Sequence, residues 1–136
     1  MLFGKVKSLE FTIEVVPRGK KNNSRIVMAG GRRLIIPSKA YKEFEEQGKK
    51  YCPPIRIDFP VNVEAHYYVQ DRRRRDLCNF HEALCDLLVA AETVVDDSVA
   101  VICSMDGSRI HLDREHPRIE VIITKGVNYD KSFEKS

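Results

Sequence analysis

Residues 71–88 read DRRRRDLCNFHEALCDLL, and this stretch joins a basic segment to the clearest helix in the sequence. Apolar side chains recur at helical spacing from Leu77 to Ala91, which predicts an amphipathic helix over residues 76–92 with Asp76 at its N-terminal edge. The preceding residues 55–69 are apolar and alternate in their second half, so they predict one long strand, or two strands broken at Pro60. The quoted stretch therefore marks the change from a strand to a helix.

The rest of the chain supplies further strands and one more helix. Alternation and turn residues predict a strand over 9–16, a β-hairpin of 25–28 and 34–36, a helix capped by Ser38 and stopped by Gly48, a buried strand over 99–105 and a last strand over 119–124. We therefore expect a single domain of mixed α/β (α+β) class, with one mixed sheet and two main helices.

Composition restricts the class of protein. A chain of 136 residues with 43% hydrophobic and 32% charged residues is typical of one globular domain and argues against disorder. No apolar run approaches the length of a membrane helix, and Met1 to Lys5 does not begin a signal peptide, so a cytoplasmic protein is expected. The four cysteines are interpreted as free thiols because none forms a Cys-x-x-Cys pair.

Basic residues are concentrated in two places, although the net charge is only +3. Arg72, Arg73, Arg74 and Arg75 are consecutive, and a second group comprises Arg18, Lys20, Lys21, Arg25, Arg32 and Arg33. Guanidinium groups match phosphate oxygens in pairs, and the N-terminus of a helix adds backbone donors. The run thus predicts contact with a phosphodiester backbone. The competing interpretation is an ordinary solvated or salt-bridged strand end.

Two carboxylates, Asp76 and Asp97, flank the predicted helix. A helix of about 16 residues spans roughly 24 Å, so the two could meet only if the following strand runs back alongside the helix. If they do meet, they offer the hard oxygen ligands that Mg²⁺ prefers. On composition alone, an ordinary turn at Asp96-Asp97 is the preferred interpretation.

The spacing of these residues resembles the RusA family of Holliday junction resolvases. The resemblance is carried by Asp71 to Phe80, followed by Val95-Asp96-Asp97-Ser98-Val99 after the helix, and extends to Asp86-Leu87-Leu88. It implies an intertwined α/β homodimer that uses Mg²⁺, with Mn²⁺ as a substitute, to make paired nicks in four-way DNA junctions. The partners expected are branched DNA and a second copy of the chain, without a membrane or an organic cofactor. The corresponding domain covers residues 1–125, and 126–136 form a polar tail.

The resemblance also implies roles for individual residues. Asp76 and Asp97 look like metal-binding catalytic aspartates. Arg75 with the neighbouring arginines looks like a set of phosphate contacts, and Asn79 lies beside them in the first turn of the helix. Further DNA contacts are expected from Lys20, Lys21 and Asn23.

The sequence departs from the family pattern at two positions. Cys78 stands where the family has a second aspartate, and a soft thiol is a poor Mg²⁺ ligand. Glu82 stands where the family often has lysine, one helical turn after Cys78. We offer the hypothesis that Glu82 is a third catalytic metal ligand. The alternatives are a protein that binds branched DNA without cutting it, or damage at Cys78 in this copy.

Two other interpretations remain open. Cys78, His81 and Cys85 recur at helical spacing and could present ligands to Zn²⁺, although no fourth ligand is in view. The preferred interpretation is that Cys85 packs and that His81 points to solvent or substrate. The chain could also be an unrelated small α/β domain with a basic edge, which would not distinguish branched from linear DNA.

Overall fold

The computed structural model describes residues 8–20 and 24–126, and the fold is the mixed α/β domain that the sequence predicts. A five-stranded mixed sheet has the order β1-β7-β4-β5, with β6 also pairing with β4. The described elements are β1 (Ser8–Ile13), β2 (Ser24–Ala29), β3 (Arg32–Pro37), α1 (Lys39–Lys49), β4 (Val61–Val69), α2 (Leu77–Ala90), β5 (Ile102–Ser104), β6 (Arg109–Leu112) and β7 (Arg118–Lys125).

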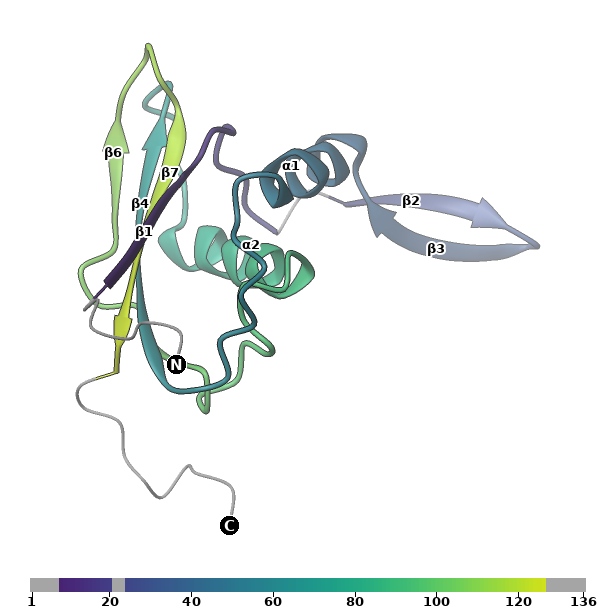
Figure 1. Ribbon diagram of the computed structural model, residues 1–136. Coiled ribbons are helices and arrows are strands. Elements are labelled where there is room, and N and C mark those ends of the chain that lie inside the picture. Colours follow the sequence, from purple (N-terminus) through teal and green to yellow (C-terminus); the bar gives the residue numbers. More distant parts are fainter. Residues whose placement is uncertain (1–7, 21–23, 127–136) are drawn as a thin grey trace.

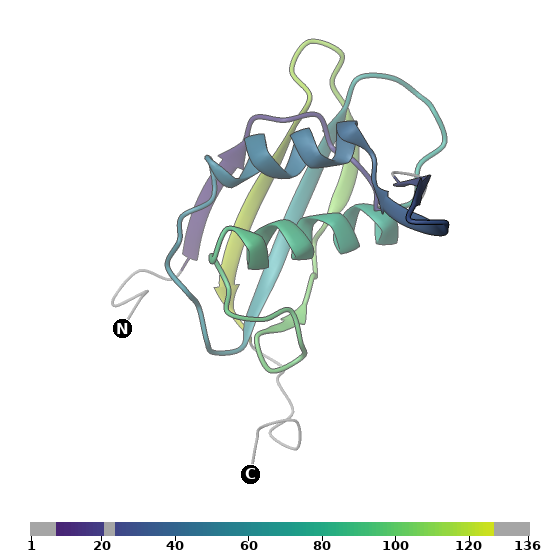
Figure 2. The ribbon, with the colours of Figure 1, turned by 90° about the vertical axis from the view of Figure 1, so that its right-hand side faces the viewer.

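Both helices cover the same face of the sheet (Figure 2). Strict alternation in β4 turns Val61, Val63, Ala65, Tyr67 and Val69 toward the helices, where all five are buried. The apolar stripe of α2 packs onto them through buried side chains that include Leu84 and Leu88. The core therefore lies between one sheet face and α2, which holds the N-terminus of α2 at a fixed place beside the end of β4.

A separate two-stranded arm, β2–β3, projects away from the body of the molecule (Figure 1). Its register pairs Ile26 with Ile35 and Met28 with Arg33. Gly30 and Gly31 form the tip, and both have positive φ angles (57° and 77°), as a tight hairpin turn requires. The predicted hairpin is thus confirmed, and it is longer than the sequence indicated.

Two of the predicted strands need correction, and one strand was missed. The buried strand expected over 99–105 is only β5, because a turn with a hydrogen bond from the amide of Val101 to the carbonyl of Ser98 takes up its first half. Between α1 and Pro60 the chain forms no strand, only an isolated bridge between Ile57 and Val94. Strand β6 was not predicted, since residues 109–112 alternate weakly between polar and apolar side chains.

Helix α1 confirms the predicted N-cap at Ser38 and contradicts the predicted end at Gly48. The hydroxyl of Ser38 accepts a hydrogen bond from the amide of Tyr41 at 3.1 Å, as expected of an N-cap. Gly48, however, does not end α1, which continues to Lys49. It is buried, and a Cβ there would lie 2.7 Å from a methyl carbon of Leu87 in α2. The glycine therefore permits the close approach of the two helices.

No helix within the described parts of the chain is long and apolar enough to span a membrane. The predicted polar tail begins at Gly126, and all its later residues lie outside the described ones, as do Met1 to Lys7.

Candidate nucleic-acid and metal site

The arginine run lies in the linker between β4 and α2, and its last member turns inward. Arg75 donates hydrogen bonds to the carbonyls of Asp71 and Arg73, both at 2.9 Å, and forms an ion pair with the Asp71 carboxylate at 2.7 Å. Its side chain is only 16% exposed. A backbone hydrogen bond from Arg73 and the side-chain bond from Arg75 lower the pKa of Asp71. Arg75 thus fixes the shape of the linker.

The other three arginines are exposed. The Arg73 side chain is 83% exposed, and its one ion pair with the described residues is a long one, to Asp71 at 3.5 Å. Arg72 and Arg74 make no hydrogen bond or ion pair with any residue in the described parts of the chain. Beside them is an open cleft of about 440 Å³, lined by Arg74, Arg75, Asp76, Leu77, Asn79 and Phe80. The linker therefore presents unpaired positive charge at the edge of a cleft.

Asp76 is the N-cap of α2. Its carboxylate accepts a hydrogen bond from the amide of Cys78 at 3.0 Å, which satisfies one of the donors that a helix start leaves unpaired. Cys78 is exposed in the first turn of the helix. Asp76 thus has a structural role in addition to the catalytic one expected from the sequence.

The loop before the arm lies against this first turn. The amide of Lys20 donates to the carbonyl of Asn79 at 3.4 Å, and a Cβ on Gly19 would lie 2.1 Å from the Asn79 amide nitrogen. The Lys20 ammonium forms an ion pair with Asp86 at 2.7 Å. Lys20 and Asn79, both expected to bind DNA, are therefore adjacent. Two further expected contacts, Lys21 and Asn23, lie outside the described residues.

Three carboxylates gather around Lys20. The hydrogen bond that Lys20 donates to Asp86, together with the charges of Asp86, Glu82 and Asp97, raises the pKa of its ammonium. Burial raises the pKa of the Cys85 thiol to about 12, and the charges of Asp97 and Asp86 add to that effect. The loop carrying Asp97 therefore returns to the side of α2. The predicted residues Glu82 and Asp97 thus act through their charges on the same ammonium, while Asp76 caps the start of the helix.

A comparison with known protein families covers most of the chain. The family model of endodeoxyribonuclease RusA matches residues 14–124. The chain belongs to the RusA family. A search of curated proteins finds no match. The matched range contains the arginine linker, α2 and the loop that carries Asp97, and membership in this endodeoxyribonuclease family supports nuclease activity on DNA.

RusA-type nucleases depend in general on divalent metal ions. Glu82, Asp86 and Asp97 carry the hard carboxylate oxygens that suit Mg²⁺; Asp86 forms an ion pair with Lys20, and the charges of Glu82 and Asp97 act on the same ammonium. The chemistry of these donors suits a hard cation. As the side chains lie, however, no three or more histidine, cysteine, aspartate or glutamate residues of the described chain are grouped to hold a metal ion.

The zinc interpretation does not gain from the structure of this RusA-family protein. Cys78 is exposed, whereas the Cys85 sulfur lies 4.0 Å from the sulfur of Met105. His81 was expected to point to solvent or substrate, and this was wrong. Its Nδ1 atom is hydrogen-bonded to the Tyr67 hydroxyl at 2.7 Å, and burial lowers its pKa. The three side chains therefore lie in different environments and do not point toward a common ion.

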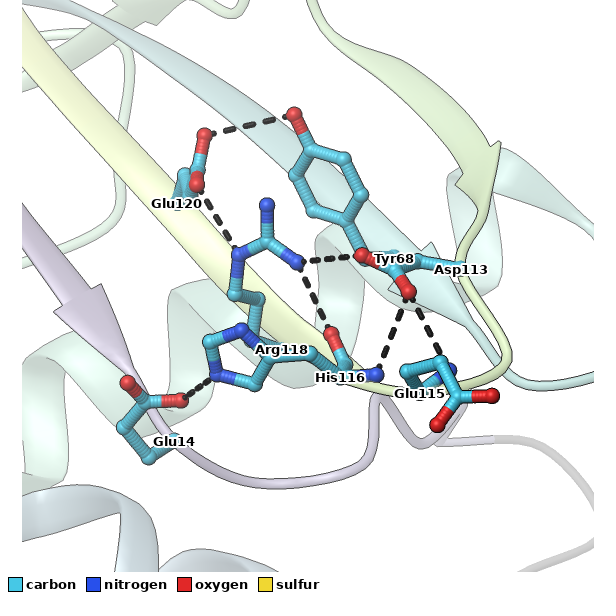
Figure 3. A network of polar contacts seen from close by, with 7 residues as sticks. All are labelled: Glu14, Tyr68, Asp113, Glu115, His116, Arg118 and Glu120. Carbon is cyan, nitrogen blue, oxygen red and sulfur yellow. Dashed lines mark hydrogen bonds and ion pairs between the residues drawn. The ribbon is translucent and has the colours of Figure 1, made fainter.

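Sequence reasoning missed one member of the site and one polar network. Asp86 was noted only as part of the family motif, yet its position one turn after Glu82 places both on the face of α2 near Lys20. On the sheet face away from the helices, Arg118 is held by Glu120 and Asp113, each at 2.9 Å, and covers the ring of Tyr68 (Figure 3). No sequence motif indicates that network.

Proposed function

We propose that this RusA-family nuclease is a divalent-metal-dependent enzyme that resolves Holliday junctions by paired nicks, with Mg²⁺ as its ion and Mn²⁺ as a substitute. The observation that carries the proposal is the presence of two features around α2: exposed arginines at its start, and the carboxylates of Glu82 in the helix and Asp97 in the loop after it, whose charges act on the same lysine. The first feature suits the phosphates of the substrate and the second suits a hard cation.

The proposed roles follow from position. Arg72, Arg73 and Arg74 bind phosphates of the junction arms, and Asn79 in the cleft and the adjacent Lys20 extend the contact. Arg75 does not contact the DNA in this proposal; its bonds to Asp71 stabilise the linker conformation that exposes the other arginines. The proposed metal ligands are Asp76, Glu82 and Asp97. When bound, a divalent ion supplies charge stabilisation at the scissile phosphate and activation of water.

A homodimer is part of the proposal because two symmetric cuts need two identical sites. The arm supports it: the face that carries Ile26, Met28 and Ile35 leaves these side chains 56%, 67% and 75% exposed. A two-stranded hairpin is marginally stable by itself in water, and an apolar face of this kind is typical of a surface that packs against another chain.

The proposal is tested by incubating the full chain with a four-way junction, a linear duplex and a single strand, each with Mg²⁺, Mn²⁺ or EDTA. We expect symmetric nicks in the junction alone, which disappear in EDTA and in Asp97→Asn. The matched control is Asp58→Asn, which removes a carboxylate from an exposed position outside the site. Equal weak binding to all three DNAs, without nicks, would contradict the proposal.

A second candidate is a branched-DNA-binding protein that has lost cutting. It is favoured by one observation: Cys78, at the family's aspartate position, is exposed and provides no hard oxygen. The variants Glu82→Gln and Cys78→Asp separate the two candidates. Loss of metal-dependent cutting in Glu82→Gln supports Glu82 as the replacement ligand. Tight junction binding without nicks in the parent, and strong cutting by Cys78→Asp, would instead support the binding protein.

A further inference from the structure

We propose that the β2–β3 arm is a second DNA contact, and that Arg32 and Arg33 near its tip bind phosphates of a duplex arm of the junction, several base pairs from the nucleotides held at the start of α2. The inference rests on the proposed action on branched DNA and goes beyond it. It gives the arm a duplex as its partner and predicts two separate groups of contacted phosphates on the same stretch of DNA.

The arm belongs to a segment in which every charged side chain is basic. Residues 15–42 contain eight lysines and arginines and no acidic residue, although the whole chain has a net charge of only +3. The other residues are therefore negative in total, and a polyanion is attracted to this segment more strongly than to the rest of the protein. The charge of the segment complements that of a nucleic acid.

Two arginines of the segment lie near the tip of the arm. Arg32 and Arg33 begin β3 directly after the hairpin turn, and both are exposed. Neither makes a hydrogen bond or ion pair with another residue in 8–20 or 24–126. As neighbours on one strand they project from opposite faces of the arm, where Arg33 pairs with Met28 and Arg32 with Ala29. The tip therefore presents a guanidinium group on each face to phosphate oxygens.

The arm starts beside the candidate site and extends away from the body of the molecule (Figure 1). The amide of Lys20 donates to the carbonyl of Asn79 in the first turn of α2, and Ser24, the first residue of β2, follows four positions later. The six residues of β2, at about 3.3 Å each, span about 20 Å. Along a duplex this length corresponds to roughly six base pairs.

The shape of the arm also suits a duplex. A two-stranded β-ribbon fits the major groove of DNA, which has a phosphate backbone on either side. A ribbon in that groove with an arginine on each face places one guanidinium near each backbone. The arm can therefore follow the DNA outward from the nucleotides that contact the linker arginines.

The experiment measures junction affinity by fluorescence anisotropy and maps the contacted phosphates by ethylation interference, with the full chain in EDTA so that no cutting occurs. Arg32→Met/Arg33→Met removes both charges, and Arg32→Lys/Arg33→Lys retains them. The matched control, Lys49→Met/Lys50→Met, removes two exposed charges at the opposite end of α1 from the arm. Urea denaturation and light scattering verify that each variant keeps the stability and the molecular mass of the parent.

We expect Arg32→Met/Arg33→Met to bind the junction about tenfold more weakly at low salt, with a slope of log affinity against log salt reduced by about two. Ethylation interference should disappear only at an outer group of phosphates, roughly six base pairs from the group that Arg72→Met/Arg74→Met removes. The charge-retaining variant and the α1 control should stay close to the parent.

Three results would overturn the inference. If the arm variant keeps the affinity and the interference pattern of the parent while the linker variant loses affinity, the inference is wrong and the proposed function stands. If its affinity falls together with its molecular mass, the tip arginines bind a second copy of the chain and not DNA. If the parent binds neither the junction nor a linear duplex, both the inference and the proposed function fail.

Discussion

Two groups of arginines show opposite uses of the same side chain. On the outer face of the sheet, Arg118 in β7 is only 15% exposed and is bonded to Asp113, Glu120 and the carbonyl of His116 (Figure 3). In the linker before α2, Arg72 and Arg74 are exposed and make no such bond with described residues. One arginine is satisfied within the fold, and the others are available to a ligand.

The difference follows from what a guanidinium group requires. It carries five N–H donors and a permanent charge, so near a protein surface it either meets acceptors of the same chain or remains in water. Arg118 meets two carboxylates, and its plane covers the ring of Tyr68 at 3.8 Å. The exposed arginines meet water, which phosphate oxygens can replace. An exposed arginine without acceptors in its own chain therefore indicates a nucleic-acid contact better than the presence of an arginine alone does.

The largest expected effect comes from removing the exposed pair. In the double variant Arg72→Met/Arg74→Met, affinity for a four-way junction should fall by about 100-fold at low salt, because each lost phosphate contact costs about tenfold there. The slope of log affinity against log salt should decrease by about two. Fluorescence anisotropy with labelled junction at several salt concentrations measures both quantities.

Urea denaturation of the same double variant provides the control. Its midpoint should match that of the parent, because neither side chain contacts another described residue through a hydrogen bond or ion pair. A fall in stability together with unchanged DNA affinity would show that these arginines stabilise the fold, as Arg118 does, and that they do not bind DNA.

The sequence alone predicted the two helices, the cap at Ser38 and the end of β4, because these depend on local patterns of apolar and capping residues. It also found the arginine run. It could not distinguish Arg75 from Arg74, since the inward turn of Arg75 depends on where the linker places Asp71. Adjacent arginines in a basic run look alike in the sequence, and their exposure differs only once the backbone conformation of the linker is known.

The carboxylate cluster was also only partly predictable. The resemblance indicated Asp97, and helical spacing indicated Glu82, but the position of Lys20 depends on a close contact between Gly19 and Asn79, which are 60 residues apart in sequence numbering. Strand β6 was missed for a related reason. Its pairing with β4 is made across the sheet and leaves little trace in the alternation of four residues.

The second prediction concerns the satisfied arginine. Arg118→Met should lower the free energy of unfolding by about 1–2 kcal/mol, because it leaves Asp113 and Glu120 without their donor at a partly exposed site. Its affinity for the junction should equal that of the parent. Urea denaturation and anisotropy test the two expectations. A loss of junction affinity with unchanged stability would place the outer sheet face in contact with DNA.

Arg75 lies between the two extremes and sharpens the comparison. Arg75→Met should lower stability by about 1 kcal/mol through its lost hydrogen bonds, and should weaken junction binding less than Arg74→Met does. The two single variants are compared by anisotropy under identical conditions. If Arg75→Met loses as much affinity as Arg74→Met and keeps its stability, then its guanidinium contacts DNA and does not serve the linker.

The smallest effect is a dependence on pH that Arg118 should show and that the exposed Arg72 and Arg74 should not. The hydrogen bond from Arg118 lowers the pKa of Asp113, and for Glu120 the same arginine outweighs the opposing effect of burial and lowers the pKa too. Because both values are depressed in the folded protein, the stabilisation is fully present above the ordinary carboxyl pKa near 4 and is lost as the pH falls through the lower folded values. The stability difference between the parent and Arg118→Met should therefore be constant from pH 7 to about 5 and shrink below about 4. Urea midpoints of both proteins across this range measure it, and a difference that persists in acid would mean that Arg118 stabilises the fold through Tyr68 instead of through the carboxylates.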